Sequence, residues 1–153
     1  MNIRFANPED KAQVLNLLDE LLTDDALKRG KKPDHTPVIK AGDQMFDSFL
    51  KDDKSKIYVA AEGEEVLGIA TFYLFPVLRR GNHRVQLEEL VVSEKHRGKG
   101  IGTALVKAVK DWCKNNNIST LRINSQVSNP DAHKFYENLG GEFSEKSFRF
   151  DLK

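Results

Sequence analysis

The 153-residue sequence contains a single cysteine, Cys113, and this scarcity excludes two common devices for stabilising a fold. One thiol cannot form an intramolecular disulfide, and it cannot supply a cysteine-based zinc cluster. The histidines show neither i,i+4 spacing nor an HExxH pattern; they are His35, His83, His96 and His133. We therefore expect no metal site.

Long apolar runs and a strong net charge are also missing. No hydrophobic stretch reaches the ~18 residues of a membrane-spanning helix, and the N-terminal residues lack the apolar core of a signal peptide. The formal net charge is +1, so the bulk charge does not indicate nucleic acid or an anionic membrane as a partner. With 39% hydrophobic and 31% charged residues, the composition is that of an ordinary globular protein. We expect a cytoplasmic protein with one domain over residues 1–153.

The spacing of apolar residues changes along the chain between the strand period and the helix period, which indicates an α/β fold. The alternating pattern predicts strands over residues 2–6, 57–61, 66–75, 85–92, 120–124 and 143–152. Helical spacing predicts helices over about 7–22, 36–50, 101–114 and 128–139, with a loop over 23–36. The resulting order, β-α-α-β-β-β-α-β-α-β, predicts helices packed on a mixed sheet.

The most informative segment is a glycine-rich loop between a predicted strand and an amphipathic helix, Arg97-Gly98-Lys99-Gly100-Ile101-Gly102-Thr103. Glycines permit positive φ angles and a close approach of the backbone to a ligand. Free amides at the start of a helix, next to two cationic side chains, favour an anion such as phosphate. The loop lacks the Gly-Lys-Ser/Thr of a Walker A motif and the Gly-x-Gly-x-x-Gly spacing of dinucleotide sites. A simple turn and a different nucleotide-phosphate enzyme remain as alternatives.

Two motifs together resemble the GCN5-related N-acetyltransferase (GNAT) superfamily. Residues 97–102 match its Arg/Gln-x-x-Gly-x-Gly/Ala signature, and the preceding residues 88–92 are similar to its fourth strand. Downstream, residues 129–140 resemble the pattern Asn-x-x-Ala-x-x-Phe-Tyr-x-x-x-Gly. One departure is that the family's Gly-Phe pair after the last helix is replaced here by Gly140-Gly141-Glu142-Phe143.

The resemblance implies a mixed, mostly antiparallel sheet flanked by helices, with two parallel strands that splay apart to form an acyl-CoA cleft. It implies acetyl-CoA as the co-substrate, with the backbone of Leu90 and Val92 against the pantetheine arm and the loop amides on the pyrophosphate. The complete set of expected cofactor-binding residues is Leu90, Val91, Val92, Arg97, Gly98, Lys99, Gly100, Ile101, Gly102, Thr103 and Asn129.

The chemistry of amine acetylation requires a base. An alkylamine with a pKa of about 10.4 is almost entirely protonated near neutral pH, and deprotonation costs about 4 kcal/mol. Glu88 and Glu89 lie next to the predicted cleft, and either could supply a carboxylate. Strict strand alternation would place Glu88 on the side of Leu90 and Val92, and Glu89 on the opposite side. On this basis we expect Glu88 to be the base, with Glu89 as the alternative and a water chain as a third possibility.

The resemblance also places Tyr136 near the cofactor sulfur, where it could protonate the departing thiolate. The acceptor is expected to be an amine on a small molecule or a peptide, and the family contains many homodimers. Two basic runs, residues 28–32 and 79–84, are either solvated loops or sites for an anionic acceptor group. Asp24 and Asp25, or Asp43 and Asp47, could instead hold a polyamine or an aminoglycoside, and the sequence does not decide between them. The leading interpretation is an N-acetyltransferase acting by direct attack in a ternary complex. The alternative is a non-catalytic acyl-CoA-binding or sensing module on the same fold.

Overall fold

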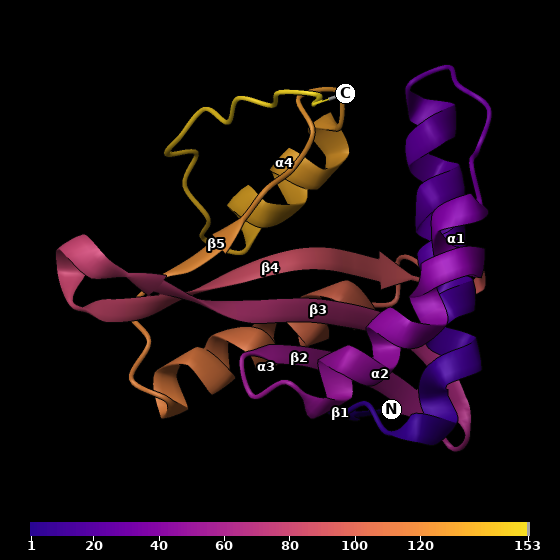
Figure 1. The fold of residues 1–153 in the computed structure, drawn as a ribbon, viewed down its shortest axis with the longest axis horizontal. Helices are drawn as coiled ribbons and strands as arrows, with labels where there is room; N and C mark the ends of the chain where they lie inside the picture. Colours follow the sequence, from indigo (N-terminus) through magenta and orange to yellow (C-terminus); the bar gives the residue numbers. More distant parts are fainter. Residues whose placement is uncertain (153) are drawn as a thin grey trace.

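The computed structural model describes residues 1–152 and consists of one five-stranded sheet with helices on both faces (Figure 1). The strands are β1 (Asn2–Phe5), β2 (Ser55–Glu62), β3 (Glu65–Val77), β4 (Asn82–Val92) and β5 (Leu121–Ile123). The α-helices are α1 (Lys11–Lys28), α2 (Asp43–Lys51), α3 (Ile101–Asn115) and α4 (Pro130–Asn138). Short helical turns cover Pro8–Asp10, Val38–Gly42, Leu78–Arg80 and Glu94–His96. The mixed sheet flanked by helices confirms the predicted fold class.

The strands lie in the sheet in their order along the chain, from β1 to β5. The first four strands are antiparallel to their neighbours, whereas β4 and β5 are parallel. The parallel pairing is short: it joins Val85–Leu87 to Leu121–Ile123 and includes none of the last five residues of β4. The predicted separation of two parallel strands is therefore present.

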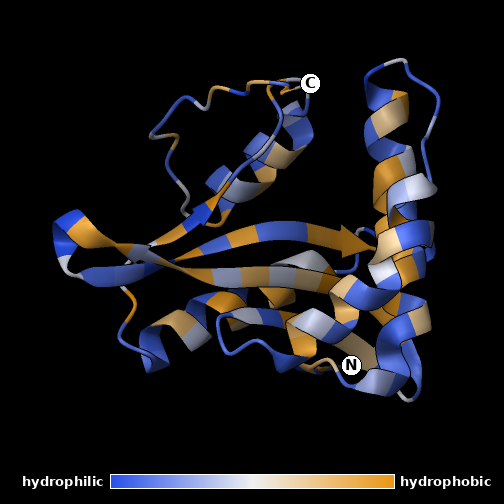
Figure 2. Ribbon diagram, viewed as in Figure 1, coloured by the Kyte–Doolittle hydropathy of each residue, from blue (hydrophilic) through white to orange (hydrophobic). Residues whose placement is uncertain are grey.

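Two hydrophobic clusters lie on opposite faces of the sheet. On one face, α3 packs through Leu105 and Val109 against Phe72 and Leu87 of the strands. On the other face, α1 and α2 bury Val14, Leu17 and Phe46 against the sheet. Figure 1 shows that α1 stands at the end of the sheet where β4 terminates, and Figure 2 shows that this end of β4 is hydrophobic. The opposite end of the β3–β4 ribbon extends beyond α1 and α2 (Figure 1).

A β-bulge in β4 overturns the strand alternation that we expected. Thr71 pairs with Glu89 and Phe72 pairs with Leu87, so Glu88 is an extra residue on β4. As a consequence, the face of the sheet covered by α3 carries Leu87, Leu90 and Val92. Val91 lies on the opposite face, which α1 covers. The prediction that Glu88 shares a face with Leu90 and Val92 was wrong, because an inserted residue shifts the phase of the pleat.

Two boundaries also differ from the sequence-based expectations. Helix α1 continues to Lys28, so residues 23–28 are helical and not part of a loop. Residues 143–152, predicted as a strand, form no regular structure, and their apolar side chains are exposed. In Figure 1 this C-terminal segment lies above β5 and α4. Its alternating pattern was misleading because a strand forms only where its backbone pairs with a neighbouring strand, and this segment pairs with none.

The first helix is fixed to β1 by a buried carboxylate. Asn7 accepts hydrogen bonds from the amides of Glu9 and Asp10, and Asp10 accepts one from the Asn7 amide at 2.8 Å. Arg4 donates two hydrogen bonds to Asp10, at 2.7 and 2.9 Å. The hydrogen bonds from Arg4 hold the pKa of Asp10 below its usual value. This reciprocal cap orients α1 against the sheet.

Asp10→Asn should lower the free energy of unfolding by about 1–3 kcal/mol at pH 7, because it breaks a charged pair on a buried group. A carboxyl with a lowered pKa stabilises the fold above its unfolded pKa, and that contribution disappears as the pH falls through the lowered value. The difference between the two proteins in urea unfolding should therefore shrink below about pH 4. Asp111→Asn, at an exposed helical position, is the control and should change stability by less than about 0.5 kcal/mol. An equal loss at pH 3 and pH 7 would contradict the role of the charge.

Candidate functional site

The open edge of β4 forms one wall of the candidate site. The amide of Ser93 donates to the carbonyl of Leu67 on β3 at 2.9 Å. Because backbone groups alternate along a strand, those of Val91 and Glu89 also face β3. The intervening residues, Leu90 and Val92, turn their backbone groups to the side where β5 has diverged. A strand edge of this kind can pair with the amides of an extended ligand.

The glycine-rich loop continues directly from this edge. Gly98 and Gly100 have φ angles of +76° and +78°, a left-handed conformation that favours glycine. The first helical hydrogen bond of α3 runs from the Ala104 amide to the Gly100 carbonyl at 3.0 Å. In the part of the chain that the structure describes, the amides from Gly98 to Thr103 donate to no protein acceptor. These consecutive free donors form a cradle that fits a pyrophosphate.

The two cations of the loop differ in their surroundings. Arg97 donates to Asp24 of α1 at 2.6 Å and to the Val92 carbonyl at 3.1 Å, so its side chain ties the loop to both elements. Lys99 is exposed and makes no ion pair within residues 1–152. Lys99 is therefore the cation available to an anion on the loop, whereas Arg97 contributes through its backbone and by holding the loop in place.

Two other predicted cofactor residues have clear structural roles. Gly102 is helical and faces α4, because a Cβ on it would make a van der Waals contact with Cζ of Phe135 at 3.4 Å. Asn129 is the N-cap of α4 and accepts a hydrogen bond from the Ala132 amide at 3.3 Å. These contacts hold α4 beside the open edge of β4.

The bulge brings both glutamates to one face of the sheet. Glu89 pairs with Thr71, which lies on the α1 side, and its amide donates to the Thr71 hydroxyl at 3.1 Å. Glu88 accepts a hydrogen bond at 3.1 Å from the hydroxyl of Tyr73, two residues further along the same face. The expectation that only one glutamate could face the reaction therefore does not hold. Tyr73 was not predicted, because its cross-strand position cannot be read from the sequence.

The two carboxylates have different environments. Glu88 is exposed, whereas Glu89 is partly enclosed by the protein. Burial, with a further contribution from the negative charge of Glu88, raises the pKa of Glu89 to about 7. A carboxylate whose pKa lies near neutral pH can both accept and release a proton there, which is the property of an effective general base.

Tyr136 and Cys113 are both largely removed from water. Burial raises the pKa of Tyr136 to about 12, so its hydroxyl keeps its proton at neutral pH. The ring packs edge-to-face on Phe135 with centroids 5.1 Å apart. Burial likewise raises the pKa of Cys113 to about 11, which leaves it as an unreactive thiol in the core.

Comparisons with known proteins agree with this geometry. Residues 16–141 match the model of the Acetyltransferase (GNAT) family. The chain is 26% identical to aminoalkylphosphonate N-acetyltransferase of Salmonella typhimurium over 148 residues, which cover 97% of this chain and 88% of that protein. It is 33% identical to N-acetyltransferase 8B of Rattus norvegicus over 95 residues, 61% of this chain and 42% of that protein.

A solved structure, described as a transcriptional regulator from Bacillus halodurans C-125, superposes with a TM-score of 0.83 at 27% identity and covers 99% of both chains. The chain spans less than half the length of several curated relatives, such as N-acetyltransferase 8B at 42%. Because the family model matches most of its residues, this chain belongs to the GNAT family.

Residues 1–152 contain no group of three or more histidine, cysteine, aspartate or glutamate side chains arranged to hold a metal ion.

None of the helices in the described part of the chain is long and apolar enough to cross a membrane.

The difference between the two glutamates can be measured by titration. Glu88→Gln should lower the pKa of Glu89, because it removes a nearby negative charge that opposes ionisation. Carbon NMR of the glutamate carboxyls would give the value directly. Glu142→Gln, an exposed glutamate after α4, is the control and should leave the Glu89 titration unchanged. A Glu89 titration near pH 4.5 in the unmodified protein would contradict the effect of burial.

Proposed function

We propose that this protein is an acetyl-CoA-dependent N-acetyltransferase that transfers an acetyl group to a primary amine by direct attack in a ternary complex. The observation that carries the proposal is the position of Glu89, a carboxylate with a pKa near 7, on the strand that has the open edge and leads to the free-amide loop. A cofactor-binding module without catalysis has no need for an acid of shifted pKa beside its cleft.

The residues that would hold acetyl-CoA follow from the free donors of the site. The amides from Gly98 to Thr103, with the charge of Lys99, fit the pyrophosphate, and the edge groups of Leu90 and Val92 fit the amide-containing arm. Bound acetyl-CoA supplies an activated acetyl group. Arg97 and Asn129 act on this site through the loop and the helix that they hold.

Glu89 is the proposed base. It removes a proton from the acceptor ammonium, directly or through water, and so supplies part of the about 4 kcal/mol that deprotonation costs near pH 7. Glu88 is the alternative base. Its proposed main effect is to raise the pKa of Glu89 by proximity, while Tyr73 holds its carboxylate.

Tyr136 is the proposed acid. Its buried hydroxyl remains protonated at neutral pH and makes no hydrogen bond to another described residue, so its proton is available to a developing thiolate. A CoA thiolate is also protonated readily by water, so a modest contribution is expected from this residue.

Catalysis should distinguish the two glutamates. Glu89→Gln should lower kcat/KM for an amine by about 10²–10⁴-fold and remove the rise of rate with pH near 7, because that rise reports loss of the Glu89 proton. Glu88→Gln should keep most of the activity and shift the rise of rate with pH to lower pH, because it lowers the pKa of Glu89. A thiol-release assay with acetyl-CoA over pH 5.5–9 measures both effects. The opposite pattern, with activity lost only in Glu88→Gln, would make Glu88 the base.

The glycine loop can be tested separately from catalysis. Gly100→Val should weaken CoA binding by about tenfold or more in calorimetry, because the side chain disfavours the φ of +78° that aligns the loop amides. Gly63→Val is the matched control, since Gly63 has a φ of +60° in the β2–β3 turn and an equally open surrounding. The two variants should lose similar stability, but only the first should lose affinity. Unchanged CoA affinity in Gly100→Val would reduce the loop to a simple turn.

A further inference from the structure

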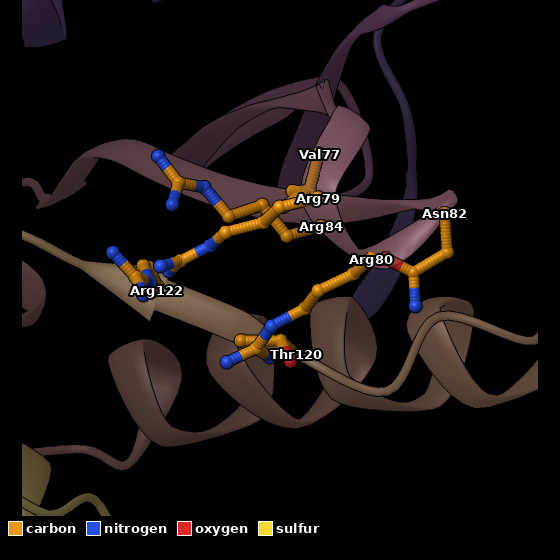
Figure 3. Close-up of a pocket in the computed structure, with 7 residues that line it drawn as sticks. All are labelled: Val77, Arg79, Arg80, Asn82, Arg84, Thr120 and Arg122. Atoms are coloured by element: carbon orange, nitrogen blue, oxygen red, sulfur yellow. The ribbon is translucent and has the colours of Figure 1, made fainter.

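A small pocket rich in arginine lies at the other end of β4 from the glycine loop. It is formed by the β3–β4 connection and the starts of β4 and β5 (Figure 3). Its lining residues are Val77, Arg79, Arg80, Asn82, Arg84, Thr120 and Arg122. In Figure 3 the side chains of Arg79 and Arg84 extend in the direction of Arg122, whereas Arg80 extends toward Thr120. Among the residues that the structure describes, none with an acidic side chain lines the pocket.

Three of the four arginines of this pocket have no carboxylate partner among residues 1–152. Within residues 1–152, Arg79, Arg80 and Arg84 make no ion pair, and the buried Nε of Arg84 has no hydrogen-bond partner. The Arg84 guanidinium lies 5.3 Å from the centroid of the exposed Phe75 ring, which holds its stem in place. A buried guanidinium nitrogen without an acceptor is costly, so this position favours an anion.

Within residues 1–152, Arg122 is the one arginine of the pocket that binds a carboxylate. Glu145 from the irregular C-terminal segment accepts two hydrogen bonds from it, one of them at 2.6 Å from Nη2. This bidentate arrangement demonstrates that a planar oxyanion fits against Arg122 from the solvent side. Glu145 belongs to a segment whose apolar residues are exposed, so an external oxyanion could displace it.

The arginines and the catalytic glutamates share one face of the sheet. Phe75 pairs with Arg84 and Tyr73 with Gln86, and Gln86 also pairs with Arg122. Residues that pair directly across strands point to the same face, so Arg84 and Arg122 lie on the side to which Tyr73 and the two glutamates point. Burial and Glu88 raise the pKa of Tyr73, while the positive charge of Arg84 opposes this rise.

The spacing along β4 fits a short molecule. Glu89 lies five positions after Arg84, which corresponds to about 16 Å of extended strand, and a bulge shortens this path. Arg122 lies nearer to the glutamates than Arg84 does, because it pairs with Gln86, and Arg84 extends in the direction of Arg122 (Figure 3). An acceptor whose amine and anionic group are a few bonds apart suits this spacing.

From this arrangement we infer that the acceptor is a small amine that also carries an anionic oxygen-acid group, a carboxylate or a phosphonate, held by Arg84 and Arg122. The inference rests on the proposed acetyltransferase function and adds the class of its acceptor. The positive pocket binds the anion by charge-assisted hydrogen bonds, and the glutamates receive the ammonium at the other end. The acceptor thereby lies along β4 with its amine near the cleft.

A matched acceptor panel tests the inference. β-Alanine, aminoethylphosphonate and the amide of β-alanine have similar size, but only the first two are anionic at the acid end. Acetyl transfer to the two anionic amines should have a kcat/KM at least about tenfold above that of the amide, mainly through KM. The faster of the two would identify the carboxylate or the phosphonate as the preferred group. Equal rates for all three amines would overturn the inference while leaving the proposed function intact.

Variants of the pocket separate recognition from folding. Arg84→Met keeps a long apolar stem over Phe75 and should reduce kcat/KM for the anionic amines at least about tenfold more than for the amide. Arg84→Lys retains the charge and should restore part of the preference. Arg149→Met, an exposed arginine paired only with Asp151, is the control and should change no rate. A uniform loss toward all three amines in Arg84→Met would assign Arg84 a structural role and contradict the inference.

A binding measurement covers the case in which no amine is acetylated. Calorimetry with aminoethylphosphonate in the presence of CoA should detect binding to the unmodified protein and at least about tenfold weaker binding to Arg84→Met. Such a result without acetyl transfer would support the anion site and refute the proposed function. Absence of binding to the unmodified protein would refute the anion site.

Discussion

One inserted residue in β4 determines the geometry of the candidate site. The bulge at Glu88 changes which side chains of the strand point to each face and which backbone groups point to each neighbour. Before the bulge, the Val85 amide donates to the Thr120 carbonyl across the β4–β5 boundary. After the bulge, Leu90 and Val92 present their backbone groups on that side, where β5 has moved away. A regular strand would turn these groups to β3 and present those of Glu89 and Val91 on the open side instead.

The same insertion explains the shifted pKa of Glu89. Two successive strand residues normally point to opposite faces, where their charges are kept apart by the sheet. At the bulge both glutamates reach the α1 side, and the negative charge of Glu88 adds to the burial of Glu89. The protein tolerates the repulsion because Tyr73 donates a hydrogen bond to Glu88 and because Glu89 can hold a proton near neutral pH. Destabilised charges of this kind are typical of sites that transfer protons.

The α1 face of the sheet thus has an acidic centre and a basic end. Arg84 and Arg122 lie toward the free end of the β3–β4 ribbon, and the glutamates lie closer to α1. An amine with an anionic group matches this sequence of charges along one strand. The glycine-rich loop follows β4 beyond the glutamates. The proposed anion site, the proposed base and the free amides of this loop thus follow one another along β4, in the order that the proposed acceptor and cofactor require.

Local features of this protein could be predicted from the sequence because each depends on neighbouring residues. The left-handed glycines of the loop, the Asn7 and Asn129 helix caps and the apolar stripe of α3 are set by short-range spacing, and the structure contains all of them. Three features could not be predicted. They are the face to which each β4 residue after Leu87 points, the contact of Tyr73 with Glu88, and the proximity of Arg84 to Arg122. They depend on how β3 and β5 pair with β4, and a bulge leaves no clear signal in alternating residues. The sequence by itself therefore determined the glycine-rich loop and the class of fold. Only the tertiary structure decided which glutamate is more enclosed and which arginines share its face, because strand pairing brings together residues distant in the chain.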